Sequence, residues 1–310
     1  MFIGFDTSNY TTSAAAYDAA RREMHSFKRL LPVKEGQLGL RQSDALFHHV
    51  QQMPEIASQA IAACGGSIDA VGVSTQPRAV NGSYMPCFSA GTTVARAVAD
   101  TAGVPLYGFS HQQGHIAAAL YSAGRVDLLD SRFIAFHFSG GTSEAVLVTP
   151  DRQQIIKCDM IAHSTDLKAG QAIDRVGVML GLPFPAGPAL EVLAADAPPS
   201  GKIKLSMNGA DPSISGLENK CKKMLGDGIA PAVIARFAID YICAVVECMS
   251  ERLISQYGRL PLVYAGGVMS NKIIANRITE RFGGCFAEPQ YSSDNAAGIA
   301  LLAAVKSKSV

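Results

Sequence analysis

The sequence has 310 residues, of which 48% are hydrophobic and 17% charged, and its formal net charge at pH 7 is +1. So much apolar surface excludes a disordered chain, and the length favours two lobes over one core. The near-neutral charge excludes a global attraction for nucleic acid, so an RNA partner would need a local patch or an accessory subunit.

The seven cysteines are scattered and form no C-x-x-C pair, which is typical of reduced thiols in a cytoplasmic protein. The first residues read as a strand with no basic region before them, so we expect no signal peptide. No apolar run is long enough to cross a membrane, and we expect no membrane partner.

The first part of the chain alternates predicted strands and helices. Residues 1–20 predict a hairpin with Asp6, Thr7 and Ser8 at its tip. The elements expected next are a helix over 44–65, a strand over 68–75, a helix over 90–105, a strand over 106–110 and a helix from His111.

The hairpin pattern returns at residues 131–151, where a strand runs into a Gly/Ser/Thr turn and out into another strand. This weak repeat indicates an internal duplication of one fold unit. The elements expected after it are a helix over 169–182, a Pro/Gly break over 183–190, a polar region over 205–220, a long amphipathic helix around 233–249, a strand and glycine turn over 260–271 and a helix over 292–308. The pattern predicts an α/β protein with a central sheet in each lobe and a ligand in the cleft between the lobes.

Glycine turns after strands are the first candidate ligand sites. In Ser139-Gly140-Gly141-Thr142 the glycines let backbone N–H groups approach a phosphate, and the hydroxyls add donors. Gly266 and Gly267 form a second such turn, with Asn271 placed to bind a ligand. Each motif alone is more often a simple tight turn. Together with the Asp6 tip, they form the pattern by which the sugar kinase, Hsp70 and actin superfamily holds a nucleotide.

His111 and His115 lie four residues apart on a predicted helix, so their side chains share one face. A pair at this spacing can bind one metal ion if a third ligand is added, although lone histidines are more often structural. Asp294 is a candidate third ligand, and it reads equally well as a helix N-cap. Two histidines and one carboxylate suit iron, zinc or another divalent ion and leave positions open for substrate oxygens.

Asp174 precedes the constrained Gly187 by thirteen residues. A carboxylate in this place could accept hydrogen bonds from ribose hydroxyls. The spacing does not distinguish this role from that of an exposed helical aspartate beside Arg175.

The motifs H-x-x-x-H, S-G-G, A-G-Q-A-I-D-R-V, L-G-L-P-F-P-A-G-P-A-L-E, S-I-S-G-L, A-G-G-V-x-x-N and S-D-N-A-A-G-I-A follow one another from His111 to Ala300. In content and order they resemble the TsaD family, long described as O-sialoglycoprotein endopeptidases. The resemblance covers essentially the whole chain. It implies the two-lobed actin-like ATPase fold, which we expect as lobes 1–125 and 126–310, with the last helix (about 294–310) packing back toward the first lobe.

The resemblance also implies a reaction. Members of the family transfer a threonylcarbamoyl group from threonylcarbamoyl-AMP to adenosine 37 of tRNA, together with partner proteins of the TsaB and TsaE type. It implies one divalent metal ion (iron or zinc) on His111, His115 and Asp294, and an AMP- or ATP-type nucleotide as ligand. By the same resemblance, Ser139, Gly140, Gly141 and Thr142 would contact the acyl-phosphate region, Asp174 and Gly187 the ribose, and Asn271 the nucleotide.

The chain departs from the family pattern in the expected cleft. The family's first loop, roughly E-T-S-C-D-E-T, is here Asp6 to Thr12 with two acidic residues lost, and S-G-G-H-T-Q has lost its histidine at Thr142. These changes leave open an altered substrate or a nucleotide-binding paralogue that acts as a regulatory or scaffold protein.

Two further alternatives rank lower. A metalloprotease needs a glutamate between the two histidines, but the intervening residues are Gln112, Gln113 and Gly114. A sugar or acetate kinase would share the fold but would not explain the histidine pair.

Overall fold

The structure, a computed structural model, describes residues 1–8, 10–32, 40–292 and 296–308. The chain divides into two units: the first comprises residues 1–131, 149–158 and 290–310, and the second 132–148 and 159–289. The first unit therefore includes both the start and the end of the chain, together with the tip of one hairpin.

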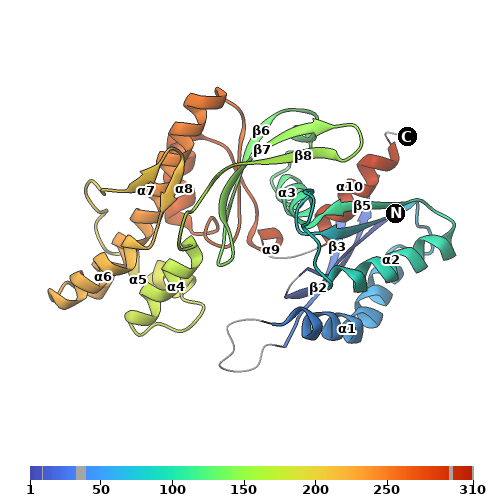
Figure 1. Ribbon diagram of the computed structural model, residues 1–310, viewed down its shortest axis with the longest axis horizontal. Coiled ribbons are helices and arrows are strands. Elements are labelled where there is room, and N and C mark those ends of the chain that lie inside the picture. Colours follow the sequence, from blue (N-terminus) through green and yellow to red (C-terminus); the bar gives the residue numbers. More distant parts are fainter. Residues whose placement is uncertain (9, 33–39, 293–295, 309–310) are drawn as a thin grey trace. The chain divides into compact units, whose positions relative to one another are not determined.

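Five strands and four α-helices of eight residues or more form the described part of the first unit (Figure 1). In chain order these elements are β1 (Phe2–Asp6), β2 (Thr11–Asp18), β3 (Glu23–Leu30), α1 (Gln42–Ala63), β4 (Ala70–Gln76), α2 (Phe88–Ala102), β5 (Leu106–Ser110), α3 (His111–Ser122) and α10 (Ala297–Lys308), with the short helices η1 (Val126–Asp130) and α9 (Pro289–Ser292) beside them.

The second unit follows the same plan, with five described helices of eight residues or more. Its elements are β6 (Phe133–Phe138), β7 (Ser143–Asp151), β8 (Ile155–His163), α4 (Ala169–Met179), α5 (Gly187–Ala194), β9 (Ser206–Asn208), β10 (Asp211–Ser213), α6 (Gly216–Gly226), α7 (Pro231–Tyr257), β11 (Leu262–Ala265), α8 (Lys272–Phe282) and β12 (Cys285–Phe286). The tip of the β7–β8 hairpin, residues 149–158, belongs to the first unit.

Each unit is built on a five-stranded sheet, in the order β3-β2-β1-β4-β5 in the first and β12-β11-β6-β7-β8 in the second. In each sheet the first two strands of the unit pair antiparallel, and the third partner strand is parallel: β1 pairs with β2 and β4, and β6 with β7 and β11. This common order confirms the duplicated α/β architecture that the sequence predicts.

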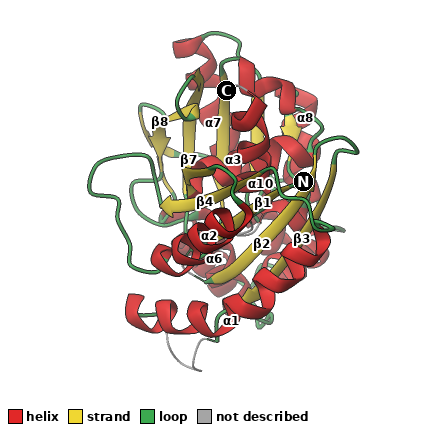
Figure 2. Cartoon of the chain, turned by 90° about the vertical axis from the view of Figure 1, so that its right-hand side faces the viewer, coloured by secondary structure: helices red, strands yellow, loops and turns green. Residues whose placement is uncertain are grey.

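Helices cover both faces of the first sheet. Ile3 and Phe5 project from β1 into an apolar cluster with Met53 of α1, and α1 runs along β2 and β3 (Figure 2). On the opposite face, Gly4 admits α10 so closely that a Cβ atom there would lie 2.5 Å from the backbone nitrogen of Ala300. Residues 297–304 of α10 are all buried, so this helix is the central element of the unit.

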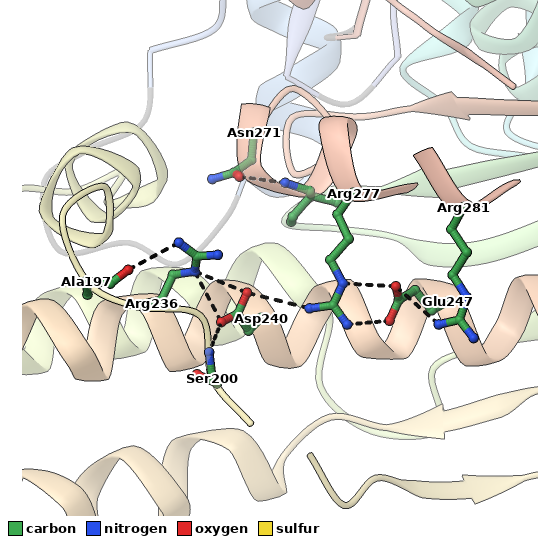
Figure 3. A network of polar contacts seen from close by, with 9 residues as sticks. Ala197, Ser200, Arg236, Asp240, Glu247, Asn271, Arg277 and Arg281 are labelled. Atoms are coloured by element: carbon green, nitrogen blue, oxygen red, sulfur yellow. Dashed lines mark hydrogen bonds and ion pairs between the residues drawn. The ribbon is translucent and has the colours of Figure 1, made fainter. Parts of the chain in front are cut away.

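A ladder of ion pairs joins α7 to α8 in the second unit (Figure 3). Asp240, fully buried on α7, contacts Arg236 at 3.1 Å and Arg277 of α8 at 3.7 Å. Glu247, further along α7, accepts hydrogen bonds from Nε and Nη2 of Arg277 at 2.9 and 2.7 Å and pairs with Arg281 at 3.3 Å. The ladder fixes α8, whose N-terminus carries Asn271.

Most predicted elements are confirmed, but the sequence analysis missed β3, β8, α5, α6, α8 and β12, together with the short helices η1 and α9. The predicted polar region over 205–220 contains two short strands and the start of α6. No helix among the described residues is long and apolar enough to cross a membrane.

Candidate functional site

The first unit places an aspartate against the predicted histidine pair. Asp6 ends β1 with its side chain fully buried, and its Oδ2 lies 2.7 Å from Nδ1 of His111. The backbone N–H of Ser8 donates to Oδ1 at 2.8 Å. Burial alone would raise the pKa of the Asp6 carboxyl. The hydrogen bonds from His111 and Ser8, together with the positive charge of His111 when its ring is protonated, outweigh burial and hold this pKa below its ordinary value.

His111 and His115 lie in the first two turns of α3, which Ser110 caps. Their rings meet edge to face with centroids 4.3 Å apart, so the predicted juxtaposition exists. The ionised Asp6 can only accept, and we therefore assign the proton of His111 to Nδ1, which leaves Nε2 as the ligand atom. A carboxylate behind a histidine in this way is the usual support of a metal ligand.

The histidine pair fits two positions of a divalent metal site in donor type and spacing. The expected third ligand, Asp294, lies outside the described residues. Within residues 1–8, 10–32, 40–292 and 296–308, no group of three or more His, Cys, Asp or Glu side chains is placed to hold a metal. Among the described residues, the argument for a metal site therefore rests on the histidine pair and on the hydrogen bond between His111 and Asp6.

Asp6 was expected at a hairpin tip but not as the partner of His111. Its neighbour Thr7 contacts a different element. The Thr7 hydroxyl donates to the Cys87 carbonyl at 2.9 Å and accepts from the Gly91 N–H at 3.1 Å, which ties the tip to α2. The sequence gives no signal for the Asp6–His111 contact, because 105 residues separate the two positions.

In the second unit the two glycine turns are neighbours. The Ser139–Thr142 turn closes with a backbone bond from Ser139 to Thr142 at 2.7 Å, and the Ser139 hydroxyl accepts from the N–H groups of Gly141 and Thr142 at 3.3 and 3.1 Å. Gly266 has φ of +97°, and a Cβ atom there would overlap the carbonyl of Phe138, the residue before the first turn.

The start of α4 packs against the Ser139–Thr142 turn. The N–H of Gly170 donates to the Ser139 carbonyl at 3.1 Å, and a Cβ atom on Gly170 would lie 2.6 Å from the backbone nitrogen of Gly140. Gly140 and Gly141 are not buried, and nothing lies within 4 Å of where their Cβ atoms would be. The turn therefore leaves open space beside Gly140 and Gly141, where a phosphate could approach the backbone.

Asp174 and Gly187 are also brought together. Oδ1 of Asp174, on α4, accepts the N–H of Ala186 at 2.8 Å, and Gly187 begins α5 at the next residue. The other carboxylate oxygen has no partner among the described residues and is free to accept a hydroxyl. This hydrogen bond ties α4 to the start of α5, a role of Asp174 that the spacing alone did not predict.

Asn271 is the N-cap of α8: its Oδ1 accepts from the Ile274 N–H at 3.1 Å. The next residue, Lys272, donates its N–H to Glu191 of α5 at 2.7 Å, which links the start of α8 to the helix that Gly187 begins. The side-chain NH₂ of Asn271 has no partner in the described part of the chain, so this group remains available to a ligand.

The fold can be compared with solved structures. Over 96% of this chain and 46% of the other, the HypF protein of T. kodakarensis superposes with a TM-score of 0.60 at 15% identity. A ROK hexokinase from Thermus thermophilus superposes with a TM-score of 0.51 at 15% identity over 100% of this chain and 99% of the other. The fold is that of the actin-like ATPases, as predicted.

The sequence itself places the chain more narrowly. The profile of TsaD, described as tRNA N6-adenosine threonylcarbamoyltransferase, matches residues 35–301, and the chain belongs to this family of acyltransferases. A protein of that name from Aromatoleum aromaticum is 27% identical over 98% of this chain and 90% of its own length.

Two archaeal proteins are similarly related. A tRNA N6-adenosine threonylcarbamoyltransferase of Methanopyrus kandleri is 26% identical over 84% of this chain and 75% of its own length. A probable bifunctional tRNA threonylcarbamoyladenosine biosynthesis protein of Halobacterium salinarum is 26% identical over 97% of this chain, which spans only 55% of that protein.

Proposed function

We propose that this chain transfers a threonylcarbamoyl group from threonylcarbamoyl-AMP to adenosine 37 of tRNA. Membership of the TsaD family supports the reaction class. The observation that carries the proposal is the His111–His115 pair with Asp6 behind it, because this arrangement orients an imidazole as a metal ligand.

In this proposal His111, His115 and Asp294 hold one divalent ion, iron or zinc. When bound, such an ion supplies Lewis-acid polarisation of substrate oxygens. The chain's own residues hold the nucleotide part of the donor. The exposed turn at Gly140 and Gly141 contacts phosphate oxygens through the N–H of Gly140, because the N–H of Gly141 already donates to the Ser139 hydroxyl. The free carboxylate oxygen of Asp174 accepts a ribose hydroxyl, and Asn271 donates its amide N–H.

The transfer needs no protein nucleophile. The N6 amine of adenine forms a bond to the carbamoyl carbon, the bond from that carbon to the phosphate oxygen breaks, and AMP leaves with the electron pair. The N6 proton passes to solvent. The role of the second-unit residues is to hold the two reactants in position.

We propose further that the chain works in the cytoplasm with accessory subunits of the TsaB and TsaE type. A net charge of +1 supports this, because phosphate contacts supply most of the affinity for RNA and the chain has an excess of only one cationic residue.

One observation favours a second candidate, a nucleotide-binding protein without transferase activity. Thr11, where the family loop has a glutamate, and its neighbour Thr12 are buried residues of β2, and the Thr12 hydroxyl lies 2.8 Å from Nδ1 of the buried His49. These side chains are used in the core of the unit and are not available to a substrate.

The test is metal content and transfer activity measured on the same preparations. Anaerobically purified chain should contain about one equivalent of a transition metal. The His111→Ala/His115→Ala double variant should lose both the metal and the transfer of labelled threonylcarbamoyl to tRNA in the presence of partners. His25→Ala, on the exposed edge strand β3, is the matched control and should retain both. Nucleotide binding with metal but without transfer would establish the second candidate instead, and an absence of metal in the wild type would contradict the proposed site.

A further inference from the structure

Gln113, between the two histidines, uses every hydrogen-bonding group of its side chain. Its Oε1 accepts from the N–H of Ser110 at 2.7 Å and from the Ser110 hydroxyl at 3.0 Å. Its Nε2 donates to the carbonyls of Gln154 and Ile156 at 3.2 and 2.7 Å. An amide has two acceptor sites and two donor hydrogens, so this side chain, 1% exposed, is fully satisfied.

The two carbonyls come from the tip of the β7–β8 hairpin, where the backbone is strained. Oδ1 of Asp151 accepts the N–H groups of Gln153 and Gln154 at 2.8 and 2.7 Å and so closes the turn. The next residue, Ile155, has φ of +66°, the left-handed region that glycine usually occupies in a three-residue hairpin loop. A β-branched residue in this region is an outlier.

Ile155, the residue with positive φ, lies in the chain between Gln154 and Ile156, whose carbonyls accept from the Gln113 amide. With φ positive at Ile155, the carbonyls before and after it both reach the same NH₂ group. The Ile155 side chain is buried, with 8% exposed, so packing helps to hold the conformation. The strained conformation at Ile155 and the Gln113 hydrogen bonds therefore occur together, and strained backbone of this kind is common near functional sites.

We propose that Gln113 and the strained turn at Ile155, here called the Gln113 clamp, position His111 against Asp6. Ser110, Gln113 and His111 belong to one helical turn, closed by the capping box of α3. The Gln113 amide joins that turn to a fixed hairpin tip, and the direction of the His111 side chain follows from it. Gln113 is a positioning residue: it touches no reactant and acts through His111.

The clamp requires an amide. A glutamate at position 113 could still accept from Ser110, but its second oxygen would face two carbonyl oxygens with no proton to share. The clamp also requires a backbone that can hold a positive φ at residue 155, which glycine does readily and proline cannot. The expected effect on metal affinity rests on the proposed function. The expected effect on the Asp6–His111 hydrogen bond does not, because that contact forms without a metal.

Four variants test the clamp: Gln113→Glu, Gln113→Met, Ile155→Gly and Ile155→Pro. The first readout is the imidazole ¹⁵N–¹H spectrum of the ¹⁵N-histidine-labelled chain, with the His111 signals assigned by His111→Gln. It reports the Nδ1–H hydrogen bond to Asp6 without any metal. The second readout is zinc affinity, measured by competition with a chromophoric chelator. Circular dichroism confirms folding, and Glu247→Gln in the second unit is the control for lowered stability alone.

We expect the hydrogen-bonded His111 signal to remain in Ile155→Gly and in Glu247→Gln, and to be lost in both Gln113 variants and in Ile155→Pro. Zinc affinity should fall about tenfold or more in the same three variants. Folded Gln113 variants with the wild-type His111 signal would overturn the proposal, even if Ile155→Pro failed to fold. Equal loss in Ile155→Gly and Ile155→Pro would show that side-chain packing, not the clamp, sets His111. If the wild type bound no zinc but the His111 signal still changed as expected, the clamp would stand and the proposed metal function would fail.

Discussion

At the scale of single residues, the buried His49 makes the free energy of unfolding of the first unit depend on pH. The ring is fully buried, its Nδ1 lies 2.8 Å from the Thr12 hydroxyl, and its Nε2 has no partner among the described residues. Burial lowers the pKa of His49 from 6.5 to about 4, against a raising effect of the Asp6 charge. The native state therefore keeps this imidazole neutral.

The sign of the effect follows from proton uptake. Between pH 6.5 and 4 the unfolded chain binds a proton at His49 that the native chain does not, so the free energy of unfolding falls as the pH falls. From pH 7 to pH 5 the expected loss from this residue is about 2 kcal/mol. Urea unfolding at the two pH values measures it, and His49→Gln should show a smaller loss than the wild type. Equal losses in both proteins would contradict the prediction.

From the sequence, contacts within one helix could be predicted better than contacts between distant segments. The spacing of His111 and His115 was enough to predict their contact, because helical geometry is local. Asp6 behind His111, Ala186 on Asp174 and the hairpin tip on Gln113 are contacts between distant segments, which no spacing reveals. Ile155 is harder still: the sequence signal for its conformation is a glycine, and an isoleucine stands there.

At the scale of elements, the crossing of α3 and α10 controls where the histidines lie. Gly114, between the histidines, and Gly298 meet at the crossing, where a Cβ atom on Gly298 would overlap the Gly114 carbonyl and lie 2.6 Å from the Ala118 nitrogen. We expect Gly298→Ala to lower the free energy of unfolding by about 2–3 kcal/mol, since the obstacle is backbone and cannot rotate away.

The matched control is Gly226→Ala at the end of α6, where nothing lies within 4 Å of the new methyl group. It should leave stability unchanged or raise it slightly, because alanine is the better helix former. Chemical denaturation of both variants decides the matter. A Gly298→Ala protein as stable as the control would mean that α10 can shift away from α3.

The ion-pair ladder between α7 and α8 leads to a second prediction at this scale, which concerns how much the ladder contributes to stability. Glu247→Gln removes the charge that pairs with both Arg277 and Arg281, and the side chain of Glu247 is only 8% exposed. The loss should be about 2 kcal/mol. Glu251→Gln removes an exposed partner of Arg281, and its cost should stay below about 1 kcal/mol. Urea unfolding compares the two variants. Equal losses in the free energy of unfolding would show that solvent screens the Glu247 pairs as strongly as the exposed Glu251 pair.

Helices and strands could be predicted from the sequence where the local pattern of apolar residues determines the secondary structure. The first hairpin, the strands around Gly140 and the long helix α7 all have clear apolar periodicity. β3 is mostly exposed and polar, and it is a strand because β2 offers a partner for its hydrogen bonds. α6 is rich in lysine with few apolar residues, and its place depends on the packing of Leu217 and Cys221 in the core of the second unit.

At the scale of the whole molecule, the first unit depends on both ends of the described chain. Removal of residues 290–310 would take away α10 and expose one face of β1 and β4. We expect this truncation to unfold the first unit while residues of the second unit keep their structure, because the described residues of the second core lie between 134 and 286. Hydrogen exchange of backbone amides, read unit by unit, measures this. Retained protection in β1 and β4 would contradict it.

The burial of α10 has a consequence for how the protein is made. A ribosome releases β1, β2, α1 and α2 first, but the helix that completes their core is synthesised only after the whole of the second unit. The N-terminal half of the nascent chain must therefore wait, with apolar surface exposed, while the segment that ends near residue 289 is free to fold ahead of it. In this protein the segment that is synthesised first completes its fold after the second unit, and that waiting segment is where a chaperone is expected to bind.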